Sequence, residues 1–499
     1  MAHPDLIEIV PLTAPVHAEI TVPGSKSITN RALVLAALAD GEVTLDGALW
    51  SEDTQVMFDC LGRLGFEVRV ELDPNEFCNR TITVRGRGGE IPNAGTAEKP
   101  LELFVGNAGT AARFLSAMVC LGRGVYRLSG VPRMHERPQA ALFSALRELG
   151  YRVDSVNDKL PVVIHGGSSR GNETLPEKDE QRLPTSSPTK KCRVSIEKSS
   201  QFASALLLCA ERGGWPIEVV GENAEESPYV AMTLEMIKVF PESGGKFQIE
   251  PDASSGSYFW ATGRFGILLG SEDGQMDEHR EQLTLAQDWM LTVRVRGWPS
   301  SGWQIDANFP DVMFPLGSSS VEFGFETEEN MRLSYGPEWR EDHEVAKDFD
   351  TAPLEFSRQE DLGDSIMTAI VIAPFGIRSF KFTELGRLRL QECERVVALR
   401  TELTKCGAKV IETGDTLEVF PSSLHGAEIE TYDDHRMAMC FAVLGLKVPG
   451  IKLRHPSCVK KTFPNFFQKL AAAPPHGLGV TILDARTGRK LSHEELFAD

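Results

Sequence analysis

Apolar and polar residues follow one pattern that recurs along the chain: a strand-like run, a cluster of small polar residues, then an apolar stretch rich in small residues. The first cluster is Ser25-Lys26-Ser27, and the apolar stretch after it, 32–38, stops at Asp40-Gly41. Small polar residues favour helix N-caps, and Gly favours helix ends, so each cluster predicts a helix start. The six clusters begin at Ser25, Gly106, Ser199, Asp252, Gly363 and Asp433.

A second pattern lies between these clusters, namely an amphipathic helix that ends in glycine and is followed by a strand. It occurs around Gly65, Gly150 and Gly407. Together the two patterns predict a unit of strand, helix, strand, helix and one or two strands, and six such units indicate an α/β protein built from internal repeats. Helices rich in small apolar residues tend to be buried on all sides. We therefore expect the polar clusters to converge in a shared cleft, the alternative being that each is only a helix cap.

Three segments break the pattern. Residues 166–191 are rich in Gly, Ser, Pro and Lys, which is typical of a surface loop. The acidic, Pro- and Trp-containing region 270–361 predicts an elaborated or partly irregular unit. The residues after Pro474 are expected to form a peripheral extension.

Composition limits the possible functions. The 499 residues are 41% hydrophobic, enough for two or more domains, and the net charge of −19 argues against general attraction to nucleic acid or anionic membranes. The nine cysteines show no CxxC or zinc-like spacing, no secretory signal opens the chain, and no apolar run approaches the roughly 20 residues of a membrane span. We expect a soluble protein of a reducing compartment, by default the cytoplasm.

Several polar clusters carry chemistry suited to anions. Free N–H groups and the positive dipole end at the start of the first helix favour an anion, to which Lys26 adds a full charge. Ser27 and Arg31 lie four residues apart on one helix face. An ordinary capped helix with solvated cations is the alternative.

The cluster Gly106-Asn107-Ala108-Gly109-Thr110 also suits an oxyanion, because Gly109 lacks a Cβ and lets backbone amides approach closely. Arg113 follows one helical turn later. Ser199, Ser200 and Gln201 supply neutral donors suited to phosphate or carboxylate oxygens.

Other candidates are ambiguous when taken singly. Arg133 follows a proline in a loop, where a solvated side chain is the plainer interpretation. Glu392 and Arg395 are one turn apart, usually the mark of a surface pair. The cluster Asp433-Asp434-His435-Arg436 is either a helix cap or an acid, an imidazole and a guanidinium brought together. Lys461 carries no signal on its own.

Seven ordered stretches resemble the enolpyruvyl transferases, and they match the shikimate branch better than the branch that uses UDP-N-acetylglucosamine. They are PGSKSITNRA, GNAGTAARF, PRMHERP, SSQFASALL, DASSGSYF, DDHRMAMCF and KKTFP. The resemblance covers roughly the first 470 residues and is weakest in 270–361. Seven motifs in one order are far more specific than a single glycine motif.

The resemblance implies an inside-out α/β barrel fold with two similar domains, each of three βαβαββ units, joined by two crossovers. We place the crossovers near Val22 and Asp252. One domain is then discontinuous, 1–22 with 252–473, around an inserted domain 23–251, and 474–499 is the peripheral extension.

The resemblance also implies a reaction of aromatic amino acid and chorismate biosynthesis. Phosphoenolpyruvate gives its carboxyvinyl group to a hydroxyl of a phosphorylated alicyclic acid, shikimate 3-phosphate, and phosphate leaves. The family needs no metal or organic cofactor; a base, an acid and anion-binding cations suffice. Domain closure would exclude water and bring these groups together. We expect a monomer that binds small molecules, with no nucleic-acid or membrane partner.

By motif match, two sets of residues would hold the two substrates. The phosphoenolpyruvate set is Lys26, Gly109, Arg133, Gln201, Arg395, Arg436 and Lys461. The acceptor set is Ser27, Arg31, Ser199, Ser200, Ser227 and Tyr229. In the catalytic group, which includes Lys26, Asp364 would act on the acceptor hydroxyl, Glu392 would handle the methylene proton and His435 would assist. Asn107, Thr110 and Arg113 are further candidates for substrate binding.

Two positions depart from the family pattern on the acceptor side. Arg387 stands where the family carries Asn, and Gln391 where it carries Lys. Because a charged hydrogen bond is worth about 1.5–3 kcal/mol against about 1 for a neutral one, the loss of the lysine costs roughly tenfold or more in binding. If Gln391 faces the acceptor, restoring Lys should raise activity. Three hypotheses follow: a shikimate-pathway transferase, an enolpyruvyl transferase with another acceptor, or an inactive paralog.

Overall fold

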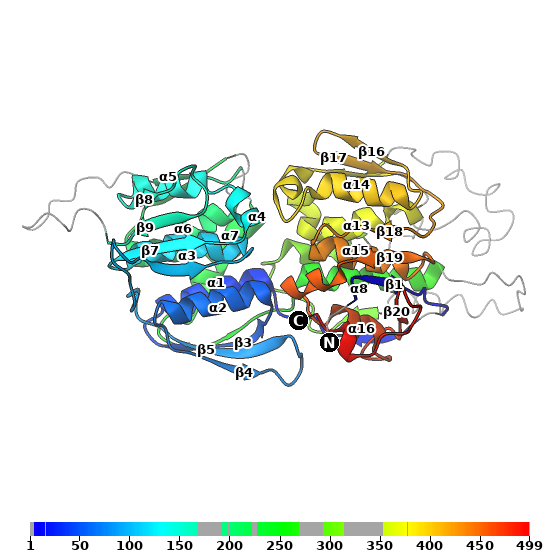
Figure 1. Cartoon of the computed structure of the whole chain (residues 1–499), viewed down its shortest axis with the longest axis horizontal. Coiled ribbons are helices and arrows are strands. Elements are labelled where there is room, and N and C mark those ends of the chain that lie inside the picture. Colours follow the sequence, from blue (N-terminus) through cyan, green and yellow to red (C-terminus); the bar gives the residue numbers. More distant parts are fainter. Residues whose placement is uncertain are drawn as a thin grey trace, which may run out of the picture. The chain divides into compact units, whose positions relative to one another are not determined.

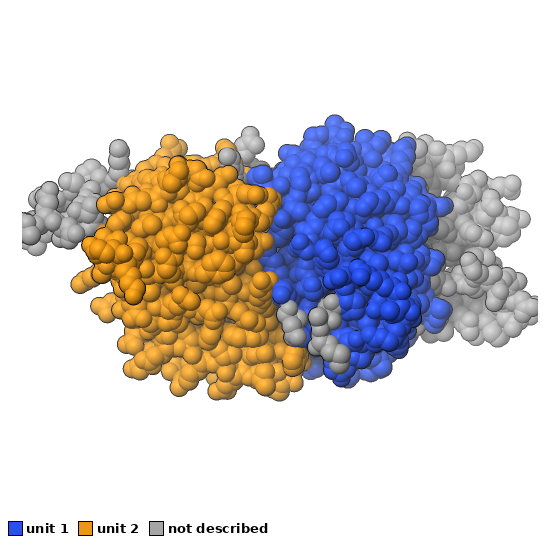
Figure 2. Space-filling view, in the orientation of Figure 1, with its two compact units in different colours: residues 1–22, 251–499 blue, residues 23–250 orange. Residues whose placement is uncertain are grey.

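The structure is a computed structural model, and it describes residues 4–14, 16–167, 192–197, 199–221, 227–268, 293–313, 353–376 and 378–498. The chain divides into two compact units: unit 1 is residues 1–22 and 251–499, and unit 2 is residues 23–250 (Figure 2). The surface loop expected at 166–191 lies outside the described residues from residue 168 onward. Most of the irregular region expected at 270–361 also lies outside them.

Unit 2 contains three sheets in its described residues (Figure 1). In their strand order they are β12 (Gly245–Gln248), β3 (Glu42–Leu49), β5 (Asn79–Arg85) and β4 (Val68–Leu72); β6 (Leu101–Phe104), β7 (Val125–Ser129), β9 (Val162–His165) and β8 (Arg152–Asp154); and β10 (Cys192–Ser195) with β11 (Ile217–Val220). Its helices are α1 (Lys26–Leu38), α2 (Glu52–Arg63), α3 (Gly109–Met118), α4 (Pro132–Glu136), α5 (Ala140–Glu148), α6 (Gln201–Gly213) and α7 (Pro228–Val239).

Unit 1 also contains three sheets in its described residues. They are β18 (Glu428–Ile429), β19 (Ile451–Arg454), β1 (Leu6–Ile9) and β20 (Ile482–Asp484); β14 (Leu354–Ser357), β15 (Phe380–Thr383), β17 (Thr416–Val419) and β16 (Val410–Thr413); and β13 (Val293–Val295) with β2 (Ala18–Ile20). Its α-helices are α8 (Ala253–Leu268), α10 (Phe309–Met313), α13 (Ile366–Ile372), α14 (Arg395–Lys405), α15 (His435–Gly445) and α16 (Phe466–Ala471). Short helical turns that matter below are η4 (Ile305–Asn308), η6 (Arg358–Leu362), η7 (Gly363–Ser365), η9 (Leu385–Leu390) and η10 (Pro456–Lys461).

All four four-stranded sheets repeat one pairing scheme, in which the first pair is parallel and the next two are antiparallel. The chain order β6-α3-β7-α5-β8-β9 returns as β14-α13-β15-α14-β16-β17. In the other two sheets, β12 and β1 return from distant parts of the chain to complete the same arrangement. The α/β fold of small repeated βαβαββ units expected from the sequence is therefore confirmed.

The predicted helix starts and stops are local features, and the structure reproduces them. Helices α1, α3, α6, α8 and α15 begin within a few residues of the polar clusters, and α13 begins directly after η7. Gly65, Gly150 and Gly407 follow α2, α5 and α14 with φ of +89°, +94° and +93°. In each case the residue after the glycine donates its N–H to the carbonyl five residues back, which closes the last helical turn.

The helices rich in small residues form the cores of their units. Every residue of α3 is buried, as is every residue of α1 from Ile28 to Leu38.

The expectation that residues 474–499 form a peripheral extension is wrong. Strand β20 pairs with β1, and Leu478, Val480 and Leu496 are buried in the core of unit 1. The apolar residues of this segment were too widely spaced to predict a core element. None of the helices in the described ranges has both the length and the hydropathy that crossing a bilayer requires.

Candidate functional site

Lys26 lies at the first turn of α1, where the backbone N–H groups are not used by the helix. Its Nζ is 3.2 Å from Oδ2 of Asp53 on α2, and the two side chains are 18% and 6% exposed. The N–H of Ser25, just before the helix, is held by the carbonyl of Glu250 at 2.8 Å. The start of α1 therefore presents a fixed ammonium group together with a helix N-terminus.

Arg31 joins α1 to α6 and α7. Its Nε donates to Thr233 Oγ1 at 2.8 Å and its Nη2 to Ser204 Oγ at 3.0 Å. The same guanidinium donates to the carbonyls of Ser27 and Tyr229, at 3.0 and 3.3 Å. Burial lowers the pKa of Arg31 to about 10. Three residues matched to the acceptor thus meet here, although Arg31 itself is buried and already bonded to protein.

Gln201 connects the starts of α3 and α6. Its Nε2 donates to Thr110 Oγ1 at 3.2 Å, and its Oε1 accepts from Arg113 Nη1 at 3.0 Å. Arg113 also donates to the carbonyl of Pro138 at 3.2 Å and is buried. The structure therefore brings together three of the residues that the sequence proposed for an anion.

The serines matched to the acceptor lie at the starts of α6 and α7. Ser199 Oγ accepts the N–H of Gln201 at 3.3 Å, and Ser200 is the buried N-cap of α6. Ser227 is the buried N-cap of α7, and its hydroxyl has no hydrogen-bond partner among the described residues. A buried hydroxyl without a protein partner is available to a ligand or a water molecule.

Gly109 faces two guanidiniums. A Cβ at this position would lie 2.4 Å from Arg113 Nη1 and 2.9 Å from Arg137 Cζ, so a larger residue would push these two guanidiniums aside. Arg137 is 8% exposed, and its Nη1 donates to the carbonyl of Asn107 at 3.3 Å. Arg137 is therefore a buried cation directly beside the glycine-containing turn.

Arg133, the arginine matched to phosphoenolpyruvate, forms an ion pair elsewhere, so its place in that set stays a prediction. Its side chain is 41% exposed and pairs with Glu136 at 2.7 Å on the surface of α4. The stretch PRMHERP holds two arginines four residues apart, of which the motif match chose Arg133. Of the two, Arg137 is the arginine that lies beside Gly109 and Asn107. We call Lys26, Gly109, Arg113, Arg137 and Gln201 the unit 2 cluster.

Arg395, on α14, is the centre of a charged group in unit 1. Its Nε and Nη2 bind the two oxygens of Asp434 at 2.7 and 3.1 Å, and Nη2 is also 2.9 Å from Glu392 Oε2. Burial disfavours its charged form, but the carboxylates of Asp434 and Glu392 raise the pKa of Arg395 above its usual value. Asp434 also caps α15 by accepting the N–H of Arg436 at 2.9 Å.

Gln391, one of the departures from the family pattern, also contacts this guanidinium, because its Oε1 accepts a hydrogen bond from Arg395 Nη1. The amide oxygen thus serves a residue matched to phosphoenolpyruvate. Arg387, the other departure, is half-buried in η9.

Glu392 lies between two cations. Its Oε1 is 3.0 Å from Lys461 Nζ at the end of η10, and the two side chains are 10% and 8% exposed. Its other oxygen is bound by Arg395, as described above. An acid held by an ammonium and a guanidinium in a largely buried place is not the surface pair that the i,i+3 spacing alone suggested.

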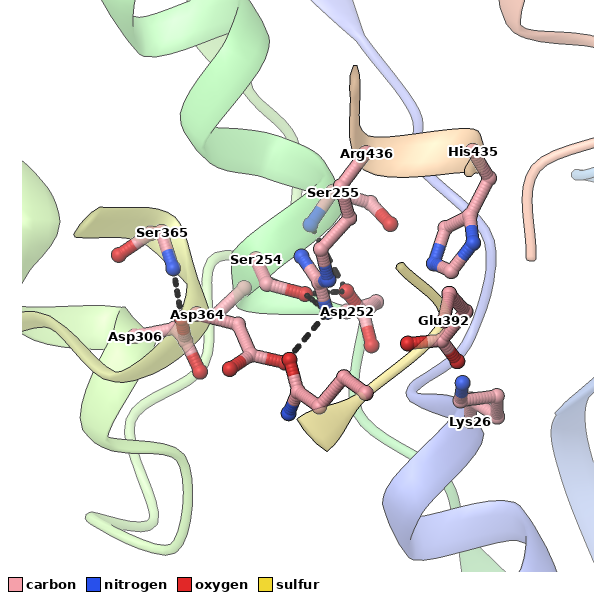
Figure 3. Close-up of polar contacts among 12 residues, drawn as sticks. Lys26, Asp252, Ser254, Ser255, Asp306, Asp364, Ser365, Glu392, His435 and Arg436 are labelled. Atoms are coloured by element: carbon pink, nitrogen blue, oxygen red, sulfur yellow. Dashed lines mark hydrogen bonds and ion pairs between the residues drawn. The ribbon is translucent and has the colours of Figure 1, made fainter. Parts of the chain in front are cut away.

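Asp364, in η7, is paired with two arginines, one of which, Arg436, is labelled in Figure 3. Its Oδ1 is 2.5 Å from Arg358 Nη2, and its Oδ2 is 3.3 Å from Arg436 Nη2. Burial opposes ionisation, but the neighbouring guanidiniums, that of Arg436 foremost, hold the pKa of the Asp364 carboxyl well below its usual value. Arg436 also donates to Ser254 Oγ at 3.0 Å.

His435 is buried at the first turn of α15, with Nδ1 3.7 Å from Asp434 Oδ1. His435 therefore lies beside the acid that binds Arg395.

The sequence analysis missed Arg358, which lies in the region where no repeat could be recognised. We call the following residues of unit 1 the unit 1 cluster: Asp364, Glu392, Arg395, Asp434, His435, Arg436 and Lys461.

The two clusters share a chemical character, since each combines buried cations with the N-termini of helices. Such groups bind phosphate and carboxylate oxygens strongly, because charged hydrogen bonds are stronger than neutral ones and strengthen further when water is excluded. The unit 1 cluster additionally holds three carboxylic acids, Asp364, Glu392 and Asp434, in contact with cations. It can therefore move protons as well as bind anions.

Comparison with known proteins gives consistent matches. The family model described as EPSP synthase (3-phosphoshikimate 1-carboxyvinyltransferase) matches residues 12–241 and 338–470. The 3-phosphoshikimate 1-carboxyvinyltransferase of Trichormus variabilis is 35% identical over 487 residues, covering 93% of this chain and 98% of its own. That of Opitutus terrae is 34% identical over 503 residues, covering 94% and 98%.

Solved structures agree in fold. The EPSP synthase from Acinetobacter baumannii superposes with a TM-score of 0.62 at 18% identity, over 96% of this chain and 99% of its own. The enolpyruvyl transferase NikO from Streptomyces tendae gives a TM-score of 0.56 at 15% identity, over 98% and 99%.

Proposed function

The chain belongs to the EPSP synthase (3-phosphoshikimate 1-carboxyvinyltransferase) family, and we propose that it transfers the carboxyvinyl group of phosphoenolpyruvate to the 5-hydroxyl of shikimate 3-phosphate and releases phosphate. The observation that carries this proposal is the unit 1 cluster, in which Glu392 bridges Lys461 and Arg395 while Asp364 faces Arg436. The reaction needs two proton-handling acids among anion-binding cations, and the cluster supplies both.

Each unit, taken by itself, supplies cations suited to phosphoenolpyruvate in this proposal. In unit 1 these are Arg395, Arg436 and Lys461, and in unit 2 they are Lys26 and Arg137. Gly109 would leave room for an oxygen beside the guanidinium of Arg137. Arg137 replaces Arg133 in the set, because only Arg137 is buried next to Gly109.

Asp364 acts on the acceptor hydroxyl. With its pKa held well below the usual value, this carboxylate is a weak base while the site is empty of anions. An anionic substrate bound to Arg436 would offset part of the guanidinium charge and raise the basicity of Asp364. Substrate binding would thus prepare the base for the hydroxyl that it must align and deprotonate.

Glu392 handles the proton of the methylene carbon. Protonation of the CH2 group makes C2 electrophilic, and the acceptor oxygen attacks it to form a new C–O bond. Loss of a proton from the resulting methyl group then restores the double bond as the C2–O bond to phosphate breaks. Lys461, 3.0 Å from Glu392, would exchange its partner carboxylate for the substrate, and His435 assists near Asp434.

The acceptor is held by the N-termini of α6 and α7 in this proposal. Ser199, Ser200 and Ser227 offer hydroxyls there, and Ser27 and Tyr229 are ordered by Arg31. These groups suit the phosphate of shikimate 3-phosphate.

The test is phosphate release from phosphoenolpyruvate and shikimate 3-phosphate, with each substrate omitted in turn as a control. The proposal predicts release only when both are present. Calorimetric titration with phosphoenolpyruvate separates the failures. Binding without turnover would indicate another acceptor, and absence of both would indicate an inactive paralog.

We also propose that the protein works as a monomer in the cytoplasm, which fits a biosynthetic enzyme whose two substrate-binding clusters both lie within one chain. Light scattering coupled to size-exclusion chromatography gives the mass directly, and 54.9 kDa is the monomer value. A dimer mass would contradict the first part of this proposal.

A further inference from the structure

Asp306 is a buried acid that supports the turn carrying Asp364. It lies in η4 and is 6% exposed. Its Oδ1 accepts the backbone N–H of Ser365 at 2.6 Å, the hydrogen bond drawn in Figure 3. Asp306 falls outside the residues matched by the family model, 12–241 and 338–470.

The other carboxylate oxygen of Asp306 packs against the start of the same turn. Gly363 has φ of +56°, and a Cβ there would lie 2.8 Å from Asp306 Oδ2 and 2.6 Å from Ile305 Cγ2. Oδ1 of Asp306 therefore holds Ser365, the residue after Asp364, and Oδ2 lies close to Gly363, the residue before it.

The two acids differ in their surroundings. Asp364 is paired with Arg358 and Arg436, whereas the contact of Asp306 is a backbone N–H. Burial, and after it the charge of Asp364, raises the pKa of Asp306 to about 7, while Arg436 opposes this shift. At about pH 6, Asp364 is therefore ionised while most of Asp306 holds a proton.

The remaining charged groups around η4 do not alter this contrast. Asp252, ahead of α8, adds a negative charge that opposes ionisation of Asp306 further. On η6, Glu360 is exposed and Asp361 accepts the N–H of Ser357. Asp311, on α10, is exposed.

We propose that Asp306 is a positioning residue for Asp364: it fixes the Gly363–Ser365 turn and leaves the negative charge of the pair on Asp364. This rests on the proposed function, in which Asp364 acts on the acceptor hydroxyl. Ionisation of Asp306 places a second negative charge beside Asp364 and opposes the binding of anionic substrates. Turnover of anionic substrates should therefore decline as Asp306 loses its proton.

The test compares Asp306→Asn with Asp311→Asn. Asparagine keeps the oxygen that accepts from Ser365 but carries no charge. We expect kcat/KM for phosphoenolpyruvate to fall above about pH 7 in the wild type and in Asp311→Asn, and to stay level in Asp306→Asn. An alkaline decline that persists unchanged in Asp306→Asn overturns the inference.

Asp306→Ala separates positioning from charge. It leaves the Ser365 N–H without a partner, so we expect kcat to fall roughly tenfold or more at about pH 6, with asparagine restoring it to within about twofold of the wild type. Equal kcat values for the alanine and asparagine variants would contradict a positioning role.

Urea unfolding gives a readout that does not depend on turnover. The unfolded chain ionises Asp306 near 3.8, whereas the folded chain holds its proton to about 7. The wild type should therefore lose stability relative to Asp306→Asn as pH rises between about 4 and about 7, and equal pH dependence would contradict the inference. If the wild type loses stability in this way but does not turn over shikimate 3-phosphate, only the proposed function is wrong. If it turns over shikimate 3-phosphate but shows no such loss of stability, only the role of Asp306 is wrong.

Discussion

Replacing Arg137 and Arg133 separately by alanine tests the composition of the unit 2 cluster. The two arginines are four residues apart, but Arg137 is 8% exposed beside Gly109 whereas the Arg133 side chain is 41% exposed and paired with Glu136. A hydrogen bond to a charged group contributes about 1.5–3 kcal/mol, so Arg137→Ala should raise KM for phosphoenolpyruvate roughly 10- to 150-fold. An exposed ion pair contributes about 0–1 kcal/mol, so Arg133→Ala should change KM by no more than roughly fivefold.

The assay is steady-state phosphate release with phosphoenolpyruvate varied at saturating shikimate 3-phosphate, which separates KM from kcat. Circular dichroism melts of both variants show whether they remain folded at the assay temperature. Arg133→Ala serves as the matched control, since it removes the same side chain from the same segment. A larger rise in KM for Arg133→Ala than for Arg137→Ala would refute the assignment.

Three further perturbations follow from the contacts. Gln391→Lys removes the oxygen that accepts a hydrogen bond from Arg395 and places an ammonium beside a guanidinium. KM for phosphoenolpyruvate should therefore rise roughly tenfold. An unchanged KM with faster turnover would show instead that the side chain at position 391 reaches the acceptor. The lowered pKa of Asp364 contributes stability above about pH 4 that is lost as pH falls. The free energy of unfolding in urea should therefore depend less on acidic pH in Asp364→Asn than in the wild type. An equal pH dependence would contradict the ion pairs of Asp364. Arg31→Lys breaks the bond to Thr233 and should lower the free energy of unfolding by about 1–3 kcal/mol, and an unchanged urea midpoint would show that Arg31 does not join α1 to α7.

The elements that were predictable from sequence are those decided by local chemistry. Glycines after α2, α5 and α14 mark helix ends because they adopt positive φ within a few residues of the last turn. Strands β1 and β12 are different, since their partners β19 and β3 are about 200 or more residues away in the chain. Nothing in the short run around either strand specifies such a partner.

The site was predictable by residue type more than by placement. The stretch PRMHERP indicated Arg133 by motif match, but only the turn of α4 shows that Arg133 is exposed while Arg137 is buried. Gln391 looked like a lost contact to the acceptor, and its hydrogen bond to Arg395 becomes visible only once the start of α14 is placed. Asp306 lies in a four-residue turn without periodicity, so no pattern marked it as buried.

The most direct test of the central claim follows the bond that the enzyme is proposed to form. Phosphoenolpyruvate carrying a carbon isotope label at C2 is incubated with the protein and shikimate 3-phosphate, and the labelled carbon is followed by NMR. The account predicts that the label moves into an enol ether of the acceptor as an equal amount of phosphate is released. Labelled pyruvate as the product, or a label that stays in phosphoenolpyruvate, would contradict it.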